Sequence, residues 1–309
     1  MQRFFLSFLI NICIAVLCYA QPSCQVKTFN LRDGLASNVI TGIKQTDDQL
    51  MWFTTWSGLA SYDGYRFTNY YDVPNQQQRV LTTNRLMELT PNSTGNIWCT
   101  TYDQHPYLFD RTQGRYVDVM AFIKEHHGVS FTCRGIISLR NGHSWLLSVN
   151  EGYMARVDDR NYQAPEGIQL FKQGEGILQG KPFNWIYEDE DNDEWIITHR
   201  GIINLKSGWA SKEPYLYITQ IGDCVFMATK DGRIGYFDKT TGKHSPLSIP
   251  DDIQGIGCLQ RLAGNRFAAT TDQGILIYNS QTEQCHLTVL PEEAKRITSS
   301  LLRLSAKRS

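Results

Sequence analysis

Short apolar and polar runs alternate along residues 38–70, and turn-forming residues separate the runs. The pattern predicts four short strands, at residues 38–46, 50–56, 59–62 and 66–70. The turns between them are Asp47-Asp48-Gln49, Ser57-Gly58 and Asp63-Gly64, which are residue types that favour tight turns. Four antiparallel strands make one sheet, and that sheet needs another layer to cover its apolar face.

Five further segments repeat this order of strands and turns, at residues 84–119, 135–158, 184–208, 216–242 and 256–289. Each repeat has an aromatic anchor in its second predicted strand, namely Trp52, Trp98, Trp145, Trp195, Phe226 and Phe267. The anchors are separated by 46, 47, 50, 31 and 41 residues. This spacing is typical of the four-stranded blades of a β-propeller. We therefore expect an all-β propeller with six recognisable blades.

The segments between and beyond the repeats complete this prediction. Residues 168–172 are expected to form the outer strand of the third blade, and residues 122–131 a helical turn or a loop. Residues 26–29 match the outermost strand of a blade, and residues 297–304 match the first strand of a partial seventh. By this repeat logic the sequence is truncated and the ring incomplete. An open ring leaves two unpaired edges, which predicts marginal stability or aggregation.

The first twenty residues have the features of a signal peptide: a positive charge at Arg3, an apolar run, and small residues before Gln21. We expect cleavage after Ala20, which leaves residues 21–309 as the propeller domain. An uncleaved membrane anchor is the alternative, but the run is short for a bilayer span; a lipoprotein signal at Cys18 or Cys24 is weaker still. No later apolar run is long enough to span a membrane, so we expect export to the periplasm without membrane insertion.

The composition limits the possible partners and the possible roles of the cysteines. The formal net charge is −1, so no overall field draws the chain to nucleic acid. The mature chain keeps six cysteines without metal-type spacing: Cys24, Cys99, Cys133, Cys224, Cys258 and Cys285. Cys258 and Cys285 lie in one blade and could form a disulfide, but we favour buried thiols.

Candidate catalytic and metal-binding groups give little support for an enzyme. The acids at residues 188–194 (EDEDNDE) resemble a calcium loop, but the expected Gly and final bidentate Glu are missing, so a solvated turn is favoured. His126-His127 suit a single metal poorly because adjacent strand residues face opposite ways. No nucleophile motif occurs. Carboxylate pairs from different blades remain open, but we assign no catalytic residue, no metal and no cofactor.

The segment NVITGIKQTDDQLMWFTTWSGLASYDGYRF, preceded by RDGLAS, resembles the two-component-regulator propeller repeat. Its order of Gly34-Leu35, Asn38, Trp52-Phe53, Gly58-Leu59 and Tyr62-Asp63-Gly64 follows that of the family. Weaker matches extend the resemblance to about residue 304. Such repeats form the periplasmic sensor region of hybrid two-component histidine kinases, in which two propellers and a β-sandwich precede a membrane helix, kinase, receiver and DNA-binding domain. The resemblance implies that the chain senses breakdown products of polysaccharides.

Aromatic side chains outside the anchor positions are the candidates for sugar binding, because aromatic faces pack against sugar C–H surfaces. They are Trp56, Tyr65, Tyr102, Tyr107, Tyr153 and Trp209. We select Trp56, Tyr102, Tyr107 and Trp209 as candidate ligand-binding residues, although packing is an ordinary role for each. Trp56 and Tyr102 follow anchor strands, in loops expected at one mouth of the ring.

Three functions therefore compete. The first is a ligand-sensing propeller that recognises an oligosaccharide, here without the kinase and membrane parts, with a homodimer through the propeller as a further option. The alternatives are a stand-alone secreted propeller that acts as a protein-interaction module, or one that acts as a polysaccharide lyase or hydrolase. If a sugar stabilises the protein and no product forms, the ligand-sensing function is favoured.

Overall fold

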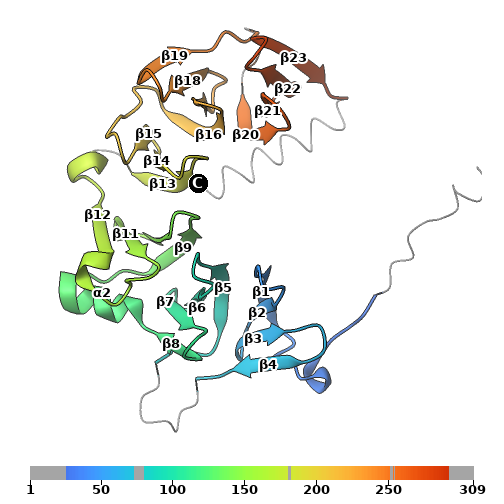
Figure 1. Ribbon diagram of the computed structural model, residues 1–309, viewed down its shortest axis with the longest axis vertical. Coiled ribbons are helices and arrows are strands. Elements are labelled where there is room, and N and C mark those ends of the chain that lie inside the picture. Colours follow the sequence, from blue (N-terminus) through green and yellow to red (C-terminus); the bar gives the residue numbers. More distant parts are fainter. Residues whose placement is uncertain (1–25, 73–79, 180–181, 251–252, 254, 292–309) are drawn as a thin grey trace, which may run out of the picture.

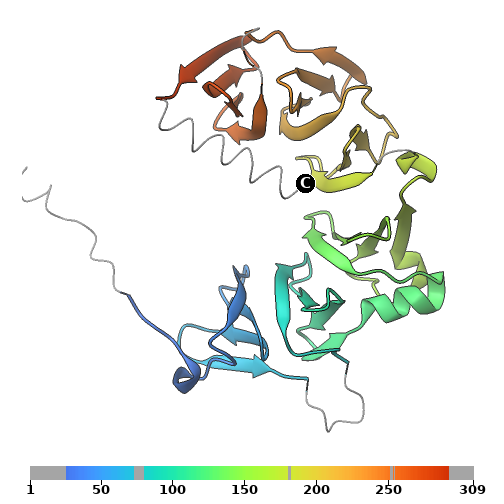
Figure 2. The same ribbon diagram turned by 180° about the vertical axis from the view of Figure 1, so that it is seen from behind.

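The computed structural model describes residues 26–72, 80–179, 182–250, 253 and 255–291. These residues form six antiparallel sheets that follow one another along an open arc (Figures 1 and 2). In each sheet the strands pair in chain order, so that each sheet is one propeller blade. The first strand of each blade lies at the inner edge of the arc (Figure 1). The prediction of an all-β propeller with an unclosed ring is confirmed.

The first three blades each have four strands. They are β1 (Ile40–Gln45), β2 (Met51–Thr55), β3 (Gly58–Tyr62) and β4 (Phe67–Tyr70); β5 (Leu86–Pro91), β6 (Ile97–Thr101), β7 (Pro106–Asp110) and β8 (Arg115–Val117); and β9 (Cys133–Ser138), β10 (His143–Ser148), β11 (Tyr153–Asp158) and β12 (Ile168–Lys172). The bounds of β12 are those expected from the sequence.

The fourth blade has three strands and the last two blades have four. They are β13 (Phe183–Glu188), β14 (Glu194–Thr198) and β15 (Gly201–Asn204); β16 (Tyr215–Ile221), β17 (Cys224–Thr229), β18 (Ile234–Asp238) and β19 (Lys243–Pro246); and β20 (Ile256–Leu262), β21 (Arg266–Thr271), β22 (Gly274–Asn279) and β23 (Gln284–Val289). In the fourth blade, a single bridge between Ile203 and Ala210 stands where an outer strand would pair.

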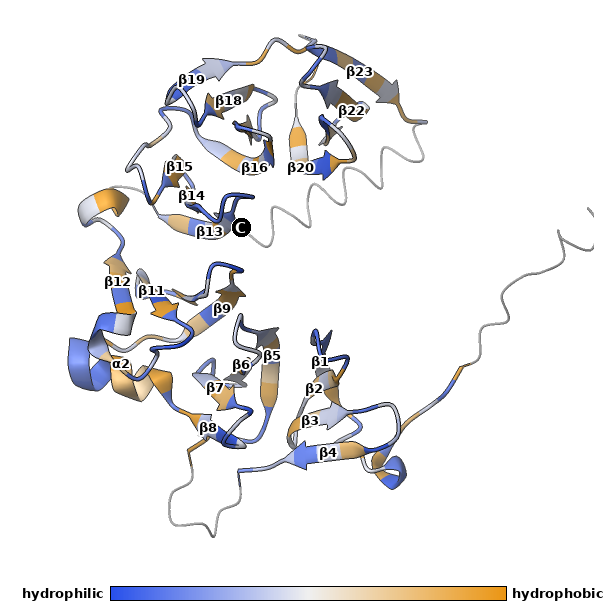
Figure 3. Cartoon of the chain, in the orientation of Figure 1, coloured by the Kyte–Doolittle hydropathy of each residue, from blue (hydrophilic) through white to orange (hydrophobic). Residues whose placement is uncertain are grey.

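In the described residues, helical structure lies before the first blade or in connections between strands. The segment after β8 forms α2 (Val119–His127), where the sequence had left a helical turn or a loop open. The hydrophobic residues of α2 gather at its start (Figure 3), and Val119, Met120 and Ile123 are buried there. Three short 3-10 helices are η1 (Leu31–Asp33), η2 (Pro165–Gly167) and η3 (Gly176–Leu178). Among the described helices, none has the length and apolar character needed to cross a bilayer.

The anchors are buried, as predicted, and they hold neighbouring blades together. All six lie in the second strand of a blade and are at most 3% exposed. Apolar clusters fill each junction between consecutive blades; Trp52, for example, packs with Leu86 and Phe109 of the second blade. Burying a large apolar side chain contributes roughly 1.5–3 kcal/mol. Each blade therefore depends on its neighbours for its core.

The Gly turn after the second strand has a specific cause. Gly58 has φ 100°, and a Cβ there would lie 2.7 Å from the Tyr70 carbonyl oxygen. Thr55, which ends β2, donates its hydroxyl proton to the Gly58 carbonyl oxygen at 2.9 Å. Thr198 and Gly201 repeat this bond in the fourth blade at 2.7 Å. The Thr-and-Gly pattern in the sequence is thus a capped turn that only glycine fits without strain.

Residues 26–29 do not form the outer strand expected from the sequence. A strand needs a paired neighbour, and this segment has none in the described structure; Phe29 instead packs its ring against Tyr62 and Phe67. The predicted signal peptide, Cys24 and the seventh-blade strand at residues 297–304 lie outside the described residues.

Cys258 and Cys285 do not form a disulfide. Cys258 is on β20 and Cys285 on β23, at opposite edges of one blade. Three strand spacings put them about 14 Å apart, whereas bridged Cα atoms lie within about 7 Å. The cysteines within the described ranges are free thiols. Cys99 and Cys133 are buried, but Cys258 is exposed, so the expectation of buried thiols holds only in part.

Candidate functional site: a pocket beside the inner-strand bulges

The six innermost strands share a β-bulge at the same place. In β1 the pairing moves from Ile40–Thr55 to Gly42–Thr54, which makes Thr41 an extra residue. The corresponding irregularity lies opposite the end of the second strand in every blade. The extra residues are Thr41, Met87 or Glu88, Arg134, Asn184, Leu216 and Gly257. Bulges redirect side chains and are frequent beside functional sites.

Neighbouring strands of a blade run in opposite directions, so successive turns lie on two opposite faces of the propeller. Turns between the first and second strands, at residues 46–50, 92–96, 139–142, 189–193, 222–223 and 263–265, define the hairpin face. Turns between the second and third strands, at residues 56–57, 102–105, 149–152, 199–200, 230–233 and 272–273, define the bulge face. The bulges lie near this second face because they stand opposite the ends of the second strands.

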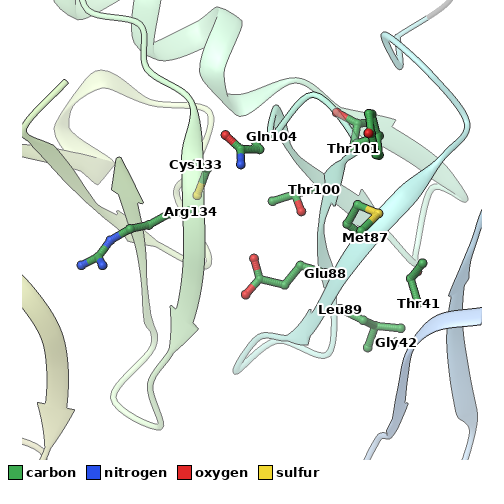
Figure 4. A pocket seen from close by; sticks show the side chains of 11 residues that line it. Thr41, Gly42, Met87, Glu88, Leu89, Thr100, Thr101, Gln104, Cys133 and Arg134 are labelled. Atoms are coloured by element: carbon green, nitrogen blue, oxygen red, sulfur yellow. The ribbon is translucent and has the colours of Figure 1, made fainter. Parts of the chain in front are cut away.

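A pocket of about 740 Å³ lies on the bulge face between the first three blades (Figure 4). It is lined by Thr41, Gly42, Met87, Glu88, Leu89, Thr100, Thr101, Tyr102, Gln104, Cys133 and Arg134. Figure 4 shows Met87 and Glu88 on opposite sides of β5, so lining residues lie on both sides of this strand. The bulge residues of three consecutive blades thus meet at one pocket.

Glu88 is the one carboxylate among the lining residues. Its side chain extends from β5 toward β9 (Figure 4), where its Oε1 accepts a hydrogen bond from Ile136 N at 3.2 Å. The donor is a backbone amide rather than a cation, and burial raises the pKa of the Glu88 carboxyl above its ordinary value. A half-buried carboxyl with a raised pKa in a pocket is a common feature of functional sites.

Two of the predicted ligand-binding aromatics lie together on the bulge face. Tyr102 lines the pocket and is 64% exposed, and Trp56, in the equivalent turn of the first blade, is 44% exposed. Arg85 connects them: its carbonyl oxygen accepts from Tyr102 N at 2.8 Å, and its guanidinium lies 5.0 Å from the centre of the Trp56 ring. Tyr102 is therefore the more open aromatic surface, since Arg85 covers part of Trp56.

The other two predicted residues have packing positions. Tyr107 is 0% exposed, and its hydroxyl oxygen accepts a hydrogen bond from Thr82 N at 3.0 Å. Trp209 is half-buried and packs against Trp195 and Phe237. Since the pocket includes neither ring, we leave both out of the site that we propose below.

The sequence analysis missed Glu88 and Arg134. A bulge is defined by pairing with the next strand, so it has no signature within its own strand. A charged residue inside an otherwise apolar innermost strand is the signal that could have found Glu88, in the run LMELTP of β5. Trp185, on β13, was missed as well; it is 49% exposed although its strand is innermost.

The acidic turn at residues 188–194 is solvated only at its middle, residues 190–192, and is buried on either side. The side chain of Asp189 is 0% exposed and that of Asp193 is 10% exposed. Lys239, one residue past β18 in the next blade, places its Nζ 2.7 Å from Asp189 Oδ2 and 2.7 Å from Asp191 Oδ2. It also lies 2.9 Å from Asp193 Oδ2. The solvated-turn prediction was wrong for Asp189 and Asp193, because the sequence of one blade does not show that a cation comes from the next blade.

Lys239 and Lys206, whose Nζ lies 2.8 Å from Asp193 Oδ1, shift the pKa values of the acids in this turn. Lys239 and Gln220 hold the pKa of Asp191 below its ordinary value. Burial alone would raise the pKa of Asp193, but hydrogen bonds from Lys206 and Lys239 outweigh it and the net shift is downward. For Lys239, burial acts to lower the pKa, and the three carboxylates reverse this and raise it.

The first and last acids of the turn bind the preceding blade. Glu188 Oε2 accepts from Arg140 N at 2.8 Å and from Arg140 Nε at 3.1 Å. Glu194 accepts from Arg156 Nη2 and from Trp145 Nε1, each at 2.7 Å. Between them, Glu190 pairs with Arg261 of the sixth blade. The turn is a joint between blades, which we call the acidic joint (residues 188–194).

Within the described ranges, no group of three His, Cys, Asp or Glu side chains is arranged to hold a metal. His126 lies on α2 with its ring centre 4.0 Å from that of Phe122, and its Nδ1 is 3.1 Å from the Phe122 carbonyl oxygen.

The fold and pocket together define a β-propeller with a polar, aromatic-edged site on one face. No family model matches the chain, and no curated protein matches its sequence. Similar solved structures include the extracellular domain of BT4673 from B. thetaiotaomicron, described as a one component system, at 14% identity and a TM-score of 0.47. The match covers 85% of this chain and 39% of that domain.

Two further solved structures have a similar fold. The extracellular domain of the hybrid two component system BT3049 from B. thetaiotaomicron is 17% identical with a TM-score of 0.42, over 82% of this chain and 42% of that one. A streptogramin B lyase is 16% identical with a TM-score of 0.45, over 87% and 88% of the two chains. This chain thus spans about two fifths of each of the two extracellular domains, and the proposals below rest on its own residues.

Proposed function

We propose that this chain is an exported propeller that recognises an oligosaccharide at the bulge-face pocket, as the ligand-sensing part of a two-component-type system. The observation that carries the proposal is the composition of the pocket. Its lining combines hydroxyl groups, the amide of Gln104, one carboxyl and the open ring of Tyr102. Hydroxyl-rich ligands need this combination of hydrogen-bonding groups and one apolar surface.

The sequence motif of the first blade supports the sensor part of the proposal. The residues that resemble the two-component-regulator propeller repeat have structural roles in this blade: Trp52 is buried, Gly58 closes the capped turn, and Asp63 accepts hydrogen bonds from the backbone of its own turn. The motif alone specifies a blade, so the ligand must be recognised by residues outside it, such as Tyr102 and Glu88.

Binding without turnover is the form of activity that the pocket favours. Hydrolysis of a glycosidic bond ordinarily uses two carboxyl groups on either side of the bond. The pocket lining holds one, Glu88. We therefore assign Glu88 to hydrogen bonding with sugar hydroxyls and assign no catalytic residue.

A thermal-shift screen of the purified protein against short oligosaccharides from plant and animal polysaccharides tests the proposal, with product analysis alongside. A ligand at about a hundredfold excess over its Kd should raise Tm by about 5 °C, with no new products. Tyr102→Ala should abolish this shift. Tyr65→Ala is the matched control, because Tyr65 is 95% exposed in a turn on the other face. Release of shortened products would favour the lyase or hydrolase alternative, and no shift with any sugar would remove the proposed function.

A further inference from the structure

Two arginines beside the bulge-face pocket, Arg85 and Arg134, have no carboxylate partner within the described residues. Arg134 donates from Nη2 to the Asn184 carbonyl oxygen at 2.6 Å and lies over the Phe183 ring at 5.6 Å. Arg85 lies over Trp56. Both are exposed. A guanidinium has five N–H donors, so each keeps several directed toward solvent.

Arg134 lines the pocket, and Arg85 lies outside the lining, next to Tyr102. Arg85 is bonded through its backbone to Tyr102, at the side of the first and second blades. Arg134 is the bulge residue of the third blade and extends away from Glu88 toward the fourth (Figure 4). A ligand several sugars long that lies across the pocket from Tyr102 passes Glu88 and reaches Arg134.

The carboxylates nearest the pocket are bonded to groups other than these two arginines. Glu88 accepts from Ile136 N at 3.2 Å. Asp103, next to Tyr102 in sequence, is outside the lining; its Oδ1 accepts from the Thr82 hydroxyl at 3.0 Å. Several cations on the hairpin face are ion-paired, as Arg111 is with Asp48 and Arg140 with Glu188.

We infer that the ligand of this pocket is an acidic oligosaccharide, whose uronic-acid carboxylates are bound by Arg85 and Arg134. The planar guanidinium matches a carboxylate with two parallel hydrogen bonds, and such charge-assisted bonds are stronger than neutral ones. Tyr102 supplies the surface for a sugar ring between the two charges. This inference rests on the proposed oligosaccharide binding and adds the charge of the ligand to it.

The test uses oligogalacturonate and its methyl ester, which has the same sugar rings without the charge, in calorimetric titrations of the purified protein. The acid should bind about tenfold or more tightly than the ester, and the ratio should fall with added salt. In the double variant that combines Arg85→Gln and Arg134→Gln, the ratio of the two affinities should approach one. The double variant that combines Arg85→Lys and Arg134→Lys should keep part of the preference for the acid. Arg160→Gln is the control, since Arg160 is exposed in the third blade near the hairpin face.

The outcomes separate this inference from the proposed function. Equal binding of acid and ester, lost in Tyr102→Ala, would overturn the acidic ligand and leave oligosaccharide binding in place. An acid preference that persists in the double Gln variant would also overturn the inference, because the charge would then be recognised elsewhere. A screen in which no oligosaccharide of either charge binds would remove both proposals. A sulfated disaccharide that binds more tightly than the uronate would contradict the carboxylate assignment.

Discussion

On the hairpin face, the acidic joint and Asp48 pair with cations from neighbouring blades; beside the pocket on the bulge face, two arginines have no carboxylate partner within the described residues. Lys239 is surrounded by three carboxylates of the acidic joint, and Arg111 pairs with Asp48 at the same position of the first blade. Arg85 and Arg134, in contrast, bind an aromatic ring or a carbonyl oxygen. Charges that the fold itself satisfies are structural, and charges that it leaves open are available to a ligand.

The comparison also holds within the hairpin face, where two equivalent turns differ in the number of carboxylates. The first blade has Thr46, Asp48 and Leu50 at the alternate positions of the turn, and Trp52 Nε1 is buried with no hydrogen-bond partner in the described structure. The fourth blade has Asp189, Asp191 and Asp193 there; Asp189 is 0% exposed and accepts from Trp195 Nε1 at 2.9 Å. The middle Asp is exposed in both turns, so the additional, buried carboxylates are what make the fourth turn a joint.

The largest effect is expected from Lys239→Met. It leaves Asp189 and Asp193 buried without their cation, which should lower the free energy of unfolding by about 3–5 kcal/mol. Arg111→Met, the equivalent change at the first blade, should cost about 1 kcal/mol because its pair is partly exposed. Urea unfolding at neutral pH measures both. Equal losses would mean that the two turns contribute alike and that burial does not distinguish them.

The difference between Lys239→Met and the unsubstituted protein should depend on pH. The pKa of Asp193 is lowered in the folded state, so its stabilisation is present above its unfolded value of about 3.8 and is lost as the pH falls through the folded value. The two unfolding free energies should therefore converge between pH 5 and about pH 2. Denaturant titrations at several pH values test this, and a gap that stays constant in acid would contradict the ion-pair assignment.

Glu194→Gln should have the next effect, about 2 kcal/mol, measured by urea unfolding. The amide oxygen can still accept from Trp145 Nε1, but Arg156 loses its charged partner. Glu166→Gln is the control: Glu166 is exposed in η2, and its substitution should change stability by less than about 0.5 kcal/mol.

Replacing the anchors by Phe should show a smaller difference between the two turns. Both Trp195→Phe and Trp52→Phe lose ring volume, but only the first removes a hydrogen bond to a buried carboxylate. We expect Trp195→Phe to cost about 1–2 kcal/mol more in thermal or urea unfolding. If Trp52→Phe were the costlier change, the indole N–H of Trp195 would not be contributing as its contact indicates.

The smallest stability effects are expected at the pocket. Tyr102→Ala and Arg134→Gln should change the free energy of unfolding by less than about 0.5 kcal/mol, because both residues are exposed. Binding of the oligosaccharide should nevertheless weaken in both. A loss of stability comparable with that of Glu194→Gln would place these residues among the structural contacts instead.

The sequence predicted the blades well because each blade is a local object. Alternation, turn residues and the anchors are all contained within one repeat, and Trp52 and Trp98 are buried where the period placed them. Contacts between blades were not predictable in this way. Lys239 and Asp189 are 50 residues apart in sequence, and the pairing of Glu88 with Ile136 depends on two bulges. Of the candidate site, the sequence indicated only Trp56 and Tyr102. The repeat pattern shows which residues follow an anchor strand and are therefore expected in exposed loops, but it shows no other property of a site.

The most direct test of the proposed function is a crystal structure of the protein with the tightest-binding oligosaccharide from the screen. We predict density for a sugar ring against Tyr102, with a hydroxyl within hydrogen-bond distance of Glu88 and the chain extending toward Arg134. Density for the sugar on the hairpin face, or on the bulge face of the fifth and sixth blades away from these residues, would contradict the assignment of the pocket.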